Sequence, residues 1–353
     1  MPWPHARPTP TPLPANWRPP SCPKPKSRRR PVSEGLYGDL AVVGGSCHPA
    51  LTEEICEYLR VVPTPITIRK FPNQNIFVRL EQSIRGKDVF LIQPLGQPVN
   101  DMVMELLITI ECLRRDSAGR ITAVVPYYAY GRTDKKDQPR VPITARLLAD
   151  LITTAGADRF LSIDLHAGQI QGFFTIPTDE LSARYSLVRY IKQQGLDRNS
   201  VIVSPDIGGV RRARNFATDL NIPLAIIEKR RSPEGDSTEF LNLIGEADGH
   251  TCILVDDEID TAGTICKAAA FLKDAGASRV IALATHPVFS DPAVERLAAA
   301  PIDQVIVTNT LPIPPEKAAV IEDKLTQLSV APLLGETIRR IHQGISVGAM
   351  FAE

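Results

Sequence analysis

The chain has 353 residues, of which 43% are hydrophobic and 23% are charged, and its 40 basic side chains balance 40 acidic ones. No apolar run approaches the roughly 18 residues that a membrane-spanning helix needs, so we expect no membrane partner. Seven of the basic residues and none of the acidic ones fall in residues 1–31, which leaves 33 basic against 40 acidic residues elsewhere. That acidic remainder disfavours a basic DNA-binding body, and we expect no nucleic-acid partner.

The six cysteines contain no Cys-x-x-Cys pair, and no histidine-rich tract accompanies them. This spacing disfavours both a zinc site and a disulfide framework. We expect reduced, partly buried cysteines in a cytoplasmic protein.

The first predicted element in chain order is a disordered tail, residues 1–38, which is rich in proline and arginine. Proline blocks helices and removes a hydrogen-bond donor, and the segment offers few apolar residues to bury. Its arginine-rich, acid-poor composition is like that of an organelle transit peptide, but the prolines would break an amphipathic helix. A loose appendage or a misassigned start site is therefore favoured over a targeting signal.

From Asp39 onward, short apolar strands alternate with helices whose apolar residues recur every three or four positions. Asp101 is predicted to cap one of these helices. The elements predicted in the first half are strands over 39–46, 88–96, 120–131 and 159–169, and helices over 49–59, 101–119 and 143–157.

The second half repeats this rhythm. Its predicted elements are strands over 200–209, 223–231, 252–258, 279–286 and 304–310, and helices over 186–196, 210–220 and 264–277. Strands that alternate with helices predict parallel sheets with helices on both faces. Two such series predict two stacked α/β domains, with a boundary near residue 180.

Polar residues follow the predicted strands at several places, and open α/β sheets bind ligands beyond the carboxyl ends of their strands. The polar strand ends are residues 127–137, 164–169, 204–209, 228–231 and 256–264. We therefore expect the functional site at these strand ends.

The last of these strand ends combines acids with a loop of small residues. Asp256 and Asp257 end a predicted strand, Asp260 follows, and residues 261–264 (Thr-Ala-Gly-Thr) lead into a helix. Successive amides before a helix suit a phosphate, and carboxylates accept hydrogen bonds from vicinal hydroxyls or bind a divalent cation. The stretch predicts a phosphorylated sugar, with its phosphate at 261–264 and its ribose hydroxyls over Asp256 and Asp260. The alternative is a solvated turn with one capping Asp, and the chain has no Walker A sequence.

Residues 254–264, Leu-Val-Asp-Asp-Glu-Ile-Asp-Thr-Ala-Gly-Thr, resemble the phosphoribosyl pyrophosphate (PRPP) motif of type I phosphoribosyltransferases and ribose-phosphate pyrophosphokinases. Further segments resemble class I-like ribose-phosphate pyrophosphokinases, in the expected order: 124–152, 164–174, 203–213, 228–231 and 307–310. The likeness runs from about Asp39 to near the carboxyl terminus. It implies two stacked type I phosphoribosyltransferase-like domains, with residues 39–180 on the ATP side and 181–353 on the ribose 5-phosphate side.

The resemblance implies transfer of the β,γ-pyrophosphoryl group of ATP to the C1 hydroxyl of ribose 5-phosphate, which gives PRPP and AMP. PRPP then serves nucleotide, histidine and tryptophan biosynthesis. The resemblance further implies Mg²⁺ as cofactor and a homo-oligomer, a hexamer with adenine sites between subunits. Two alternatives are a non-catalytic regulatory relative and a phosphoribosyltransferase, which would have no need of ATP-binding residues.

By the same resemblance, Lys229 and Arg231 contact the phosphates in catalysis, at the start of a mobile loop. The residues implied for ribose 5-phosphate are Arg231, Asp256, Asp257, Asp260, Thr261, Ala262, Gly263 and Thr264. Those implied for ATP are Phe71, Asn73, Gln74, Asn75, Arg132 and Thr133, and those implied for the metal are His166 and Asp206.

The chain departs from the family pattern at three places. Thr133 stands where the family commonly has Gln, and residues 345–351 keep only Ser346 of a segment that helps to form an allosteric site for phosphate and ADP. Asn75 stands where a Glu usually accepts the adenine amino group. An amide accepts hydrogen bonds without charge, so we expect less discrimination between ATP and GTP than in relatives with Glu.

Overall fold

The computed structural model describes residues 37–231 and 238–351, which belong to one compact unit spanning residues 32–353. The predicted tail, residues 1–38, lies outside these ranges except for Tyr37 and Gly38. Within them, no helix combines the length and the apolar character that crossing a membrane requires. The cysteines of the described ranges are free thiols.

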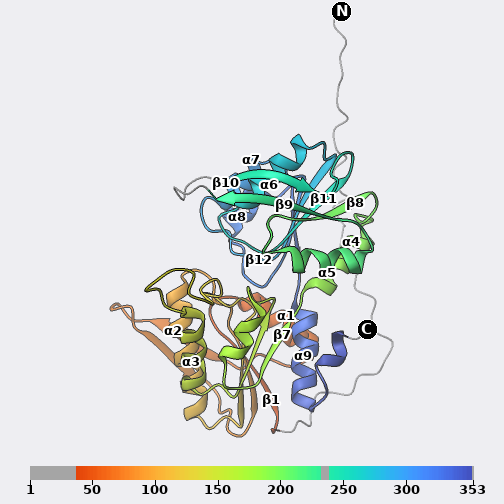
Figure 1. Cartoon of the computed structure of the whole chain (residues 1–353). Helices are drawn as coiled ribbons and strands as arrows, with labels where there is room; N and C mark the ends of the chain where they lie inside the picture. Colours follow the sequence, from red (N-terminus) through yellow and green to blue (C-terminus); the bar gives the residue numbers. More distant parts are fainter. Residues whose placement is uncertain (1–36, 232–237, 352–353) are drawn as a thin grey trace, which may run out of the picture. The chain divides into compact units, whose positions relative to one another are not determined.

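The N-terminal sheet has five parallel strands in the order β1-β4-β5-β6-β7 (Figure 1). These strands are β1 Leu40–Gly44, β4 Asp88–Ile92, β5 Arg120–Val124, β6 Arg159–Ile163 and β7 Thr178–Leu181. Parallel strands covered on both faces are apolar throughout, and β4 is buried along its whole length. Helices α2 Val99–Arg115 and α3 Thr144–Ala155 pack on one face, and α1 Pro49–Leu59 packs on the other.

The C-terminal sheet has seven strands in the order β10-β9-β8-β11-β12-β13-β14, and only β10 runs antiparallel to its neighbour. These strands are β8 Ser200–Ser204, β9 Leu224–Arg231, β10 Thr238–Ile244, β11 Thr251–Ile259, β12 Arg279–Pro287, β13 Gln304–Thr308 and β14 Leu325–Leu328. Its helices are α4 Arg184–Gln193 and α5 Val210–Leu220 on one face, and α6 Gly263–Asp274 and α7 Ala293–Ala299 on the other, with α8 Pro315–Val320 beside α7. Two mostly parallel sheets with helices on both faces confirm the predicted fold class.

A two-stranded hairpin, β2 Ile66–Lys70 and β3 Ile76–Leu80, lies outside both sheets and was not predicted. The predicted cap at Asp101 is wrong. Helix α2 begins at Val99 because Pro98, with extended backbone angles, occupies the N-cap position. Asp101 lies in the first turn of α2 and pairs with Lys70 of β2, which ties the hairpin to this helix.

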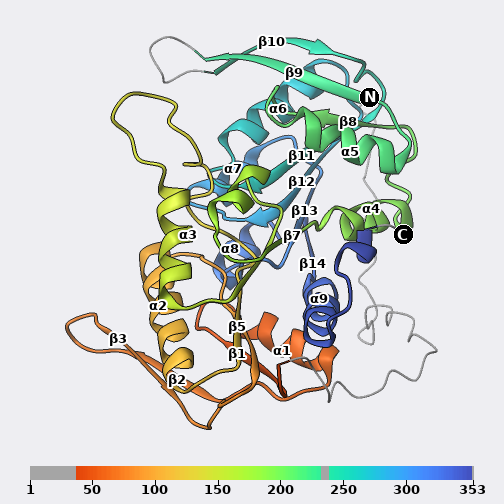
Figure 2. The same ribbon diagram turned by 60° about the horizontal axis from the view of Figure 1, so that its bottom comes forward.

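Helix α9, Ala331–Gln343, follows the last strand of the C-terminal sheet but packs against α1 of the N-terminal domain (Figure 2). Tyr58 Oη donates to Glu336 at 3.1 Å, and His342 Nδ1 lies 2.8 Å from Asp88 Oδ2. Apolar residues of α1 and α9 share one core with strands of both sheets. The chain passes from the first sheet to the second between β7 and β8, and α9 returns to pack on the first.

Candidate active site

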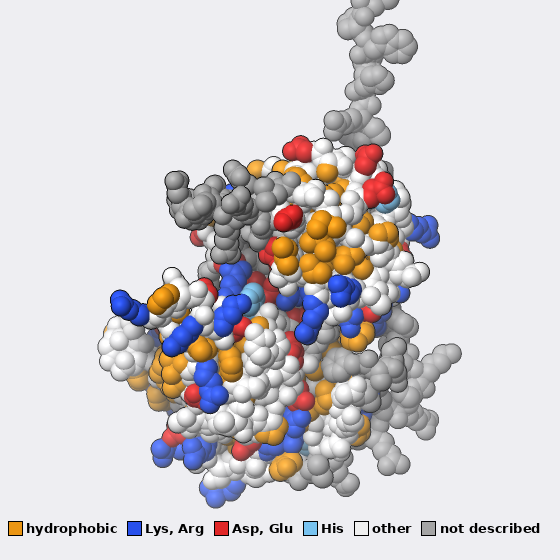
Figure 3. Space-filling view, in the orientation of Figure 1, with side chains coloured by type: hydrophobic (Ala, Val, Ile, Leu, Met, Phe, Trp, Pro, Cys, Tyr) orange, Lys and Arg blue, Asp and Glu red, His pale blue; other side chains and the backbone are white. Residues whose placement is uncertain are grey.

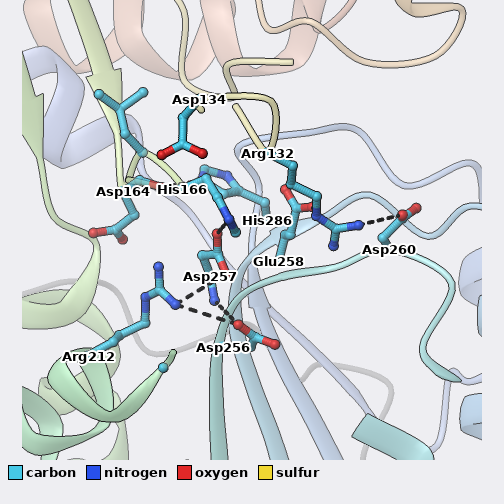
Figure 4. Close-up of polar contacts among 12 residues, drawn as sticks. Arg132, Asp134, Asp164, His166, Arg212, Asp256, Asp257, Glu258, Asp260 and His286 are labelled. Atoms are coloured by element: carbon cyan, nitrogen blue, oxygen red, sulfur yellow. Dashed lines mark hydrogen bonds and ion pairs between the residues drawn. The ribbon is translucent and has the colours of Figure 1, made fainter. Parts of the chain in front are cut away.

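Contacts between side chains bring the carboxyl ends of β5 and β6 to the end of β11. Figure 3 shows charged side chains in the hollow between the two domains, and Figure 4 shows the residues concerned. The loops after β5 and β6 carry Arg132 and His166, and β11 carries the acids. Contacts between charged side chains join the domains here. Arg132 Nη1 lies 3.1 Å from Asp260 Oδ2, and His166 Nδ1 lies 2.7 Å from Asp257 Oδ2. Residues that the sequence assigned to separate strand ends thus meet in one place.

Asp256 and Asp257 have different surroundings because successive side chains of a strand point to opposite faces. Asp257 is buried between two basic groups, His166 and Arg212, and its Oδ1 lies 3.2 Å from Arg212 Nη1. Asp256 is more exposed, and its Oδ1 lies 3.5 Å from the same nitrogen. Burial would raise the pKa of Asp257, but the hydrogen bond from His166 and the charge of Arg212 lower it well below its usual range. Asp257 stays ionised and supports His166 and Arg212, and its assignment to ribose 5-phosphate stays a prediction.

The Thr-Ala-Gly-Thr loop leaves the amino-terminal end of α6 open. Ala262 has left-handed backbone angles, φ 58° and ψ 4°, and as the N-cap residue it makes no side-chain hydrogen bond to the first turn. Thr261 and Thr264 are exposed. Amides of a first helical turn lack partners within the helix, so this end suits an anion. Arg296 of α7, which no motif indicated, donates Nη1 to the Thr261 carbonyl oxygen at 2.9 Å and adds positive charge.

Arg132 lies between two carboxylates of the β11 segment. Its Nε lies 2.5 Å from Glu258 Oε1, and its Nη1 contacts Asp260. Burial would lower the pKa of Arg132, but attraction to these carboxylates raises it overall. Glu258 was not among the predicted site residues. The signal that could have found it is its position directly after Asp256 and Asp257 in the same acidic run.

A cavity of about 380 Å³ opens beside Arg132 and extends between the two domains. Tyr127, Tyr130 and Phe289 contribute aromatic walls, and Glu258 and Asp260 contribute carboxylates. The cavity leads to the contact between Arg132 and Asp260, so it belongs to the same site.

Each of the two predicted metal ligands has a hydrogen-bond partner. The Nδ1 atom of His166 contacts Asp257, which directs Nε2 elsewhere, and a carboxylate on the other ring nitrogen is usual for a metal-binding histidine. Asp206 Oδ1 accepts a hydrogen bond from the Gly209 amide at 2.8 Å. Within the described ranges, no group of three or more His, Cys, Asp or Glu side chains could hold a metal ion. Asp206 offers the oxygen donor that Mg²⁺ prefers, whereas the nitrogen of His166 would be an unusual ligand for this ion.

A buried polar network joins the two domains beside these residues. Asp164, at the end of β6, accepts a hydrogen bond from Thr285 Oγ1 at 2.7 Å, and its carbonyl oxygen lies 3.2 Å from His286 Nε2. His286 Nδ1 lies 2.9 Å from Thr310 Oγ1. The segment 307–310, which contributed to the family resemblance, thus helps to hold His286 at the domain junction.

The predicted adenine-binding residues lie elsewhere, at the tip of the β2–β3 hairpin. Figures 1 and 2 both show this hairpin projecting from the N-terminal domain away from β11. The tip is closed by its own backbone, since the Phe71 amide donates to the Asn75 carbonyl oxygen at 2.8 Å. The Phe71 ring is 40% exposed and lies 5.3 Å from the Arg69 guanidinium carbon. The structure therefore does not bring residues 71–75 to Arg132 within one chain.

Three other predicted residues complete the account. Thr133 Oγ1 donates to the Tyr130 carbonyl oxygen at 2.8 Å, so its hydroxyl closes the loop that carries Arg132. Lys229 and Arg231 lie at the end of β9, but their side chains fall outside the described part of the structure, as do residues 232–237. Strand β8 separates β9 from the acidic strand β11.

The chain is similar to known proteins along most of its length. The N-terminal domain of ribose phosphate pyrophosphokinase matches residues 40–156, and the phosphoribosyl synthetase-associated domain matches residues 234–352. A ribose-phosphate pyrophosphokinase from Synechococcus elongatus is 52% identical over 314 residues, which cover 88% of this chain and 93% of that protein. Another, from Aquifex aeolicus, is 49% identical over 312 residues, which cover 88% and 99%. The crystal structure of phosphoribosylpyrophosphate synthetase from Mycobacterium smegmatis matches with a TM-score of 0.81 and 48% identity, over 86% of this chain and 98% of that chain.

Proposed function

The chain belongs to the ribose-phosphate pyrophosphokinase family, and from this premise we propose how its residues form PRPP and AMP from ATP and ribose 5-phosphate. The reaction transfers the β,γ-pyrophosphoryl group of ATP to the C1 hydroxyl of the sugar. Because the transferred group is highly anionic, most of the catalytic task is to position the reactants and to neutralise charge.

Ribose 5-phosphate binds at the end of β11. Its phosphate accepts hydrogen bonds from the open amides and hydroxyls of residues 261–264, with Arg296 nearby. Asp256 and Asp260, the more exposed acids, accept hydrogen bonds from the ribose hydroxyls. Asp257 holds His166 and Arg212 in place from the buried side of the strand.

The phosphates of ATP bind Arg132, whose planar guanidinium can donate two parallel hydrogen bonds to a phosphate. Adenine binds at the hairpin tip, where Phe71 stacks on the base and residues 73–75 supply amide groups. Since the tip projects away from Arg132 of the same chain, we assign the adenine side of each site to a second copy. This assignment supports a homo-oligomer, and the family resemblance favours a hexamer.

Lys229 and Arg231 contribute positive charge to the transferred group from the end of β9, Lys229 as a point charge and Arg231 bidentately. Mg²⁺, held by His166 and Asp206 together with phosphate oxygens, would add further charge neutralisation when bound. The free thiols of the described cysteines support a reducing compartment, and we place the enzyme in the cytoplasm.

The observation that supports this proposal best is the 3.1 Å contact between Arg132, which we assign to the nucleotide, and Asp260, which we assign to the sugar. The test is AMP formation from ATP and ribose 5-phosphate by wild-type protein, Lys229→Ala and Lys273→Ala. Lys273 pairs with Asp303 on the surface and is the matched control. We expect Lys229→Ala to lower kcat by about a hundredfold or more with an unchanged Tm, and the control to match the wild type.

Near-normal turnover by Lys229→Ala would contradict its catalytic role. A wild-type protein that forms no AMP, but changes the activity of an added active pyrophosphokinase, would favour the regulatory alternative.

A further inference from the structure

Arg132 has two carboxylate partners whose surroundings differ. The Glu258 side chain is 8% exposed, whereas that of Asp260 is 28% exposed. A buried carboxylate loses far more by giving up its counterion than an exposed one, because water cannot replace the lost partner. Asp260 can therefore release Arg132 at low cost, whereas Glu258 cannot.

The two carboxylates also bind different atoms of the guanidinium. Glu258 Oε1 contacts Nε, at 2.5 Å, and Asp260 Oδ2 contacts Nη1, at 3.1 Å. A guanidinium has five N–H donors in a planar fork, so a partner on Nε leaves donors on both terminal nitrogens. If Asp260 turns to a sugar hydroxyl, those donors become available to an incoming phosphate while Nε keeps its partner.

Glu258 is itself held in position. Tyr127 lines the same cavity as Glu258, and burial together with the nearby charge of this acid raises the pKa of Tyr127, so its hydroxyl stays protonated. Figure 4 shows Glu258 beside Arg132, with Asp260 on the outer side of the guanidinium. The carboxylate is therefore held by its burial and by the Arg132 guanidinium beside it.

On the basis of the proposed function, we propose that Glu258 is a positioning residue that anchors Arg132 by Nε, so that the terminal nitrogens can exchange Asp260 for a nucleotide phosphate. Asp260 is the temporary partner in the sugar-free site and Glu258 is the permanent one. Glu258 then governs affinity for the nucleotide, and the pyrophosphoryl transfer itself proceeds without it.

The alternative is that Glu258 only cross-links the two domains. In that case its loss lowers Tm and affects every kinetic constant alike. If Glu258 anchors Arg132, its loss should raise KM for ATP and leave kcat and KM for ribose 5-phosphate nearly unchanged. The two interpretations therefore predict different patterns of kinetic constants.

The experiment compares Glu258→Ala and Glu258→Gln with wild-type protein. We expect Glu258→Ala to raise KM for ATP about thirtyfold, as for a lost, largely buried ion pair, with kcat and KM for ribose 5-phosphate within about twofold. Glu258→Gln keeps an acceptor oxygen and should raise KM for ATP only about threefold. If the alanine variant does not fold, the glutamine variant carries the test.

Two controls make the result specific. Glu336→Gln removes an ion-paired glutamate on α9, far along the chain from the site, and should leave KM for ATP unchanged. In an Arg132→Ala background, Glu258→Ala should cause no further rise in KM for ATP, because the residue it positions is gone. An unchanged KM for ATP in both Glu258 variants, or an equal change in all kinetic constants, would overturn the proposal.

Calorimetric binding of a non-hydrolysable ATP analogue separates this inference from the proposed function. Wild-type protein that binds the analogue but forms no AMP overturns the activity alone, and weaker binding by Glu258→Ala still supports the anchor. Wild-type protein that forms AMP while both variants bind the analogue normally overturns the anchor alone.

Discussion

The end of β11 and the tip of the β2–β3 hairpin were both predicted to bind substrate, but they are built in different ways. The β11 acids contact Arg132, His166 and Arg212, which come from three other segments of the chain. The hairpin tip is closed by its own backbone, and the ring of Phe71 rests on Arg69 of the same hairpin. A site whose groups are oriented from several sides is organised before its ligand arrives. The tip, in contrast, gains a function only when another surface meets it.

The largest expected effect tests whether the end of β11 in one copy and the hairpin tip of a second copy form one site. Asp260→Ala should lower kcat/KM for ribose 5-phosphate about a hundredfold because it removes a charged acceptor, and Phe71→Ala should raise KM for ATP about tenfold through lost stacking. An equal mixture of the two variants, dissociated and reassembled, should regain about a quarter of the wild-type sites, because random pairing joins the two intact halves. AMP formation measures the recovery.

Two results would break this comparison. Without recovery in the mixture, the adenine side does not come from a second copy. Normal KM for ATP in Phe71→Ala would remove the tip from the nucleotide site altogether. Asp323→Ala, a change at an exposed acid of the C-terminal domain, is the control for Asp260→Ala and should behave as wild type.

A smaller effect is expected from Asn75→Glu at the hairpin tip. The added charge strengthens the hydrogen bond from the adenine amino group and repels the carbonyl of guanine, so the preference for ATP over GTP in kcat/KM should rise about three- to tenfold. Gln82→Glu, at an exposed position just after β3 of the same hairpin, controls for added charge alone. A strong preference for ATP in the wild-type protein that Asn75→Glu leaves unchanged would contradict the role of Asn75.

The smallest effect concerns stability and belongs to the β11 region alone. The hydrogen bond to Asp257 raises the pKa of His166 above its ordinary value, although burial opposes this. A raised pKa in the folded state stabilises the protein below the unfolded value of about 6.5, and this contribution is lost as the pH rises through the folded pKa. The Tm advantage of wild type over His166→Gln should thus be about 1–3 °C at pH 5.5 and vanish at high pH.

A variant of the hairpin is the control for this measurement. Phe71→Ala removes no titrating group, so its Tm difference from wild type should not change with pH. If the His166→Gln difference is equally flat, the contact between His166 and Asp257 does not titrate as the structure indicates.

Much of the fold could be predicted from local patterns. Buried parallel strands such as β4 are continuous apolar runs, and α6 follows a loop whose small residues mark its beginning. The hairpin escaped prediction because its strands are half-exposed and short, and it lies outside both sheets. The start of α2 was misplaced because a favourable capping residue, Asp101, stands two residues after the real first residue.

The site was predictable in parts and not as a whole. Asp260 and the loop after it carry a specific motif, whereas Arg212 and Arg296 are ordinary basic residues of helices until the fold brings Arg212 to the acids and Arg296 to the Thr261 carbonyl oxygen. Glu258 was overlooked because its importance comes from Arg132, which is 126 positions earlier in the chain and in the other domain. Contacts between two domains depend on how the sheets face each other, which local sequence patterns do not encode.

The packing of α9 on α1 has a consequence for how the protein is made. Tyr58 and Glu336, which join these helices, are separated by 278 positions in the chain. Ribosomes deliver a chain from its amino end, at about 5–20 residues per second, so the first domain waits many seconds with an apolar flank uncovered. The early half of this enzyme thus keeps an aggregation-prone apolar surface exposed until α9 has been synthesised.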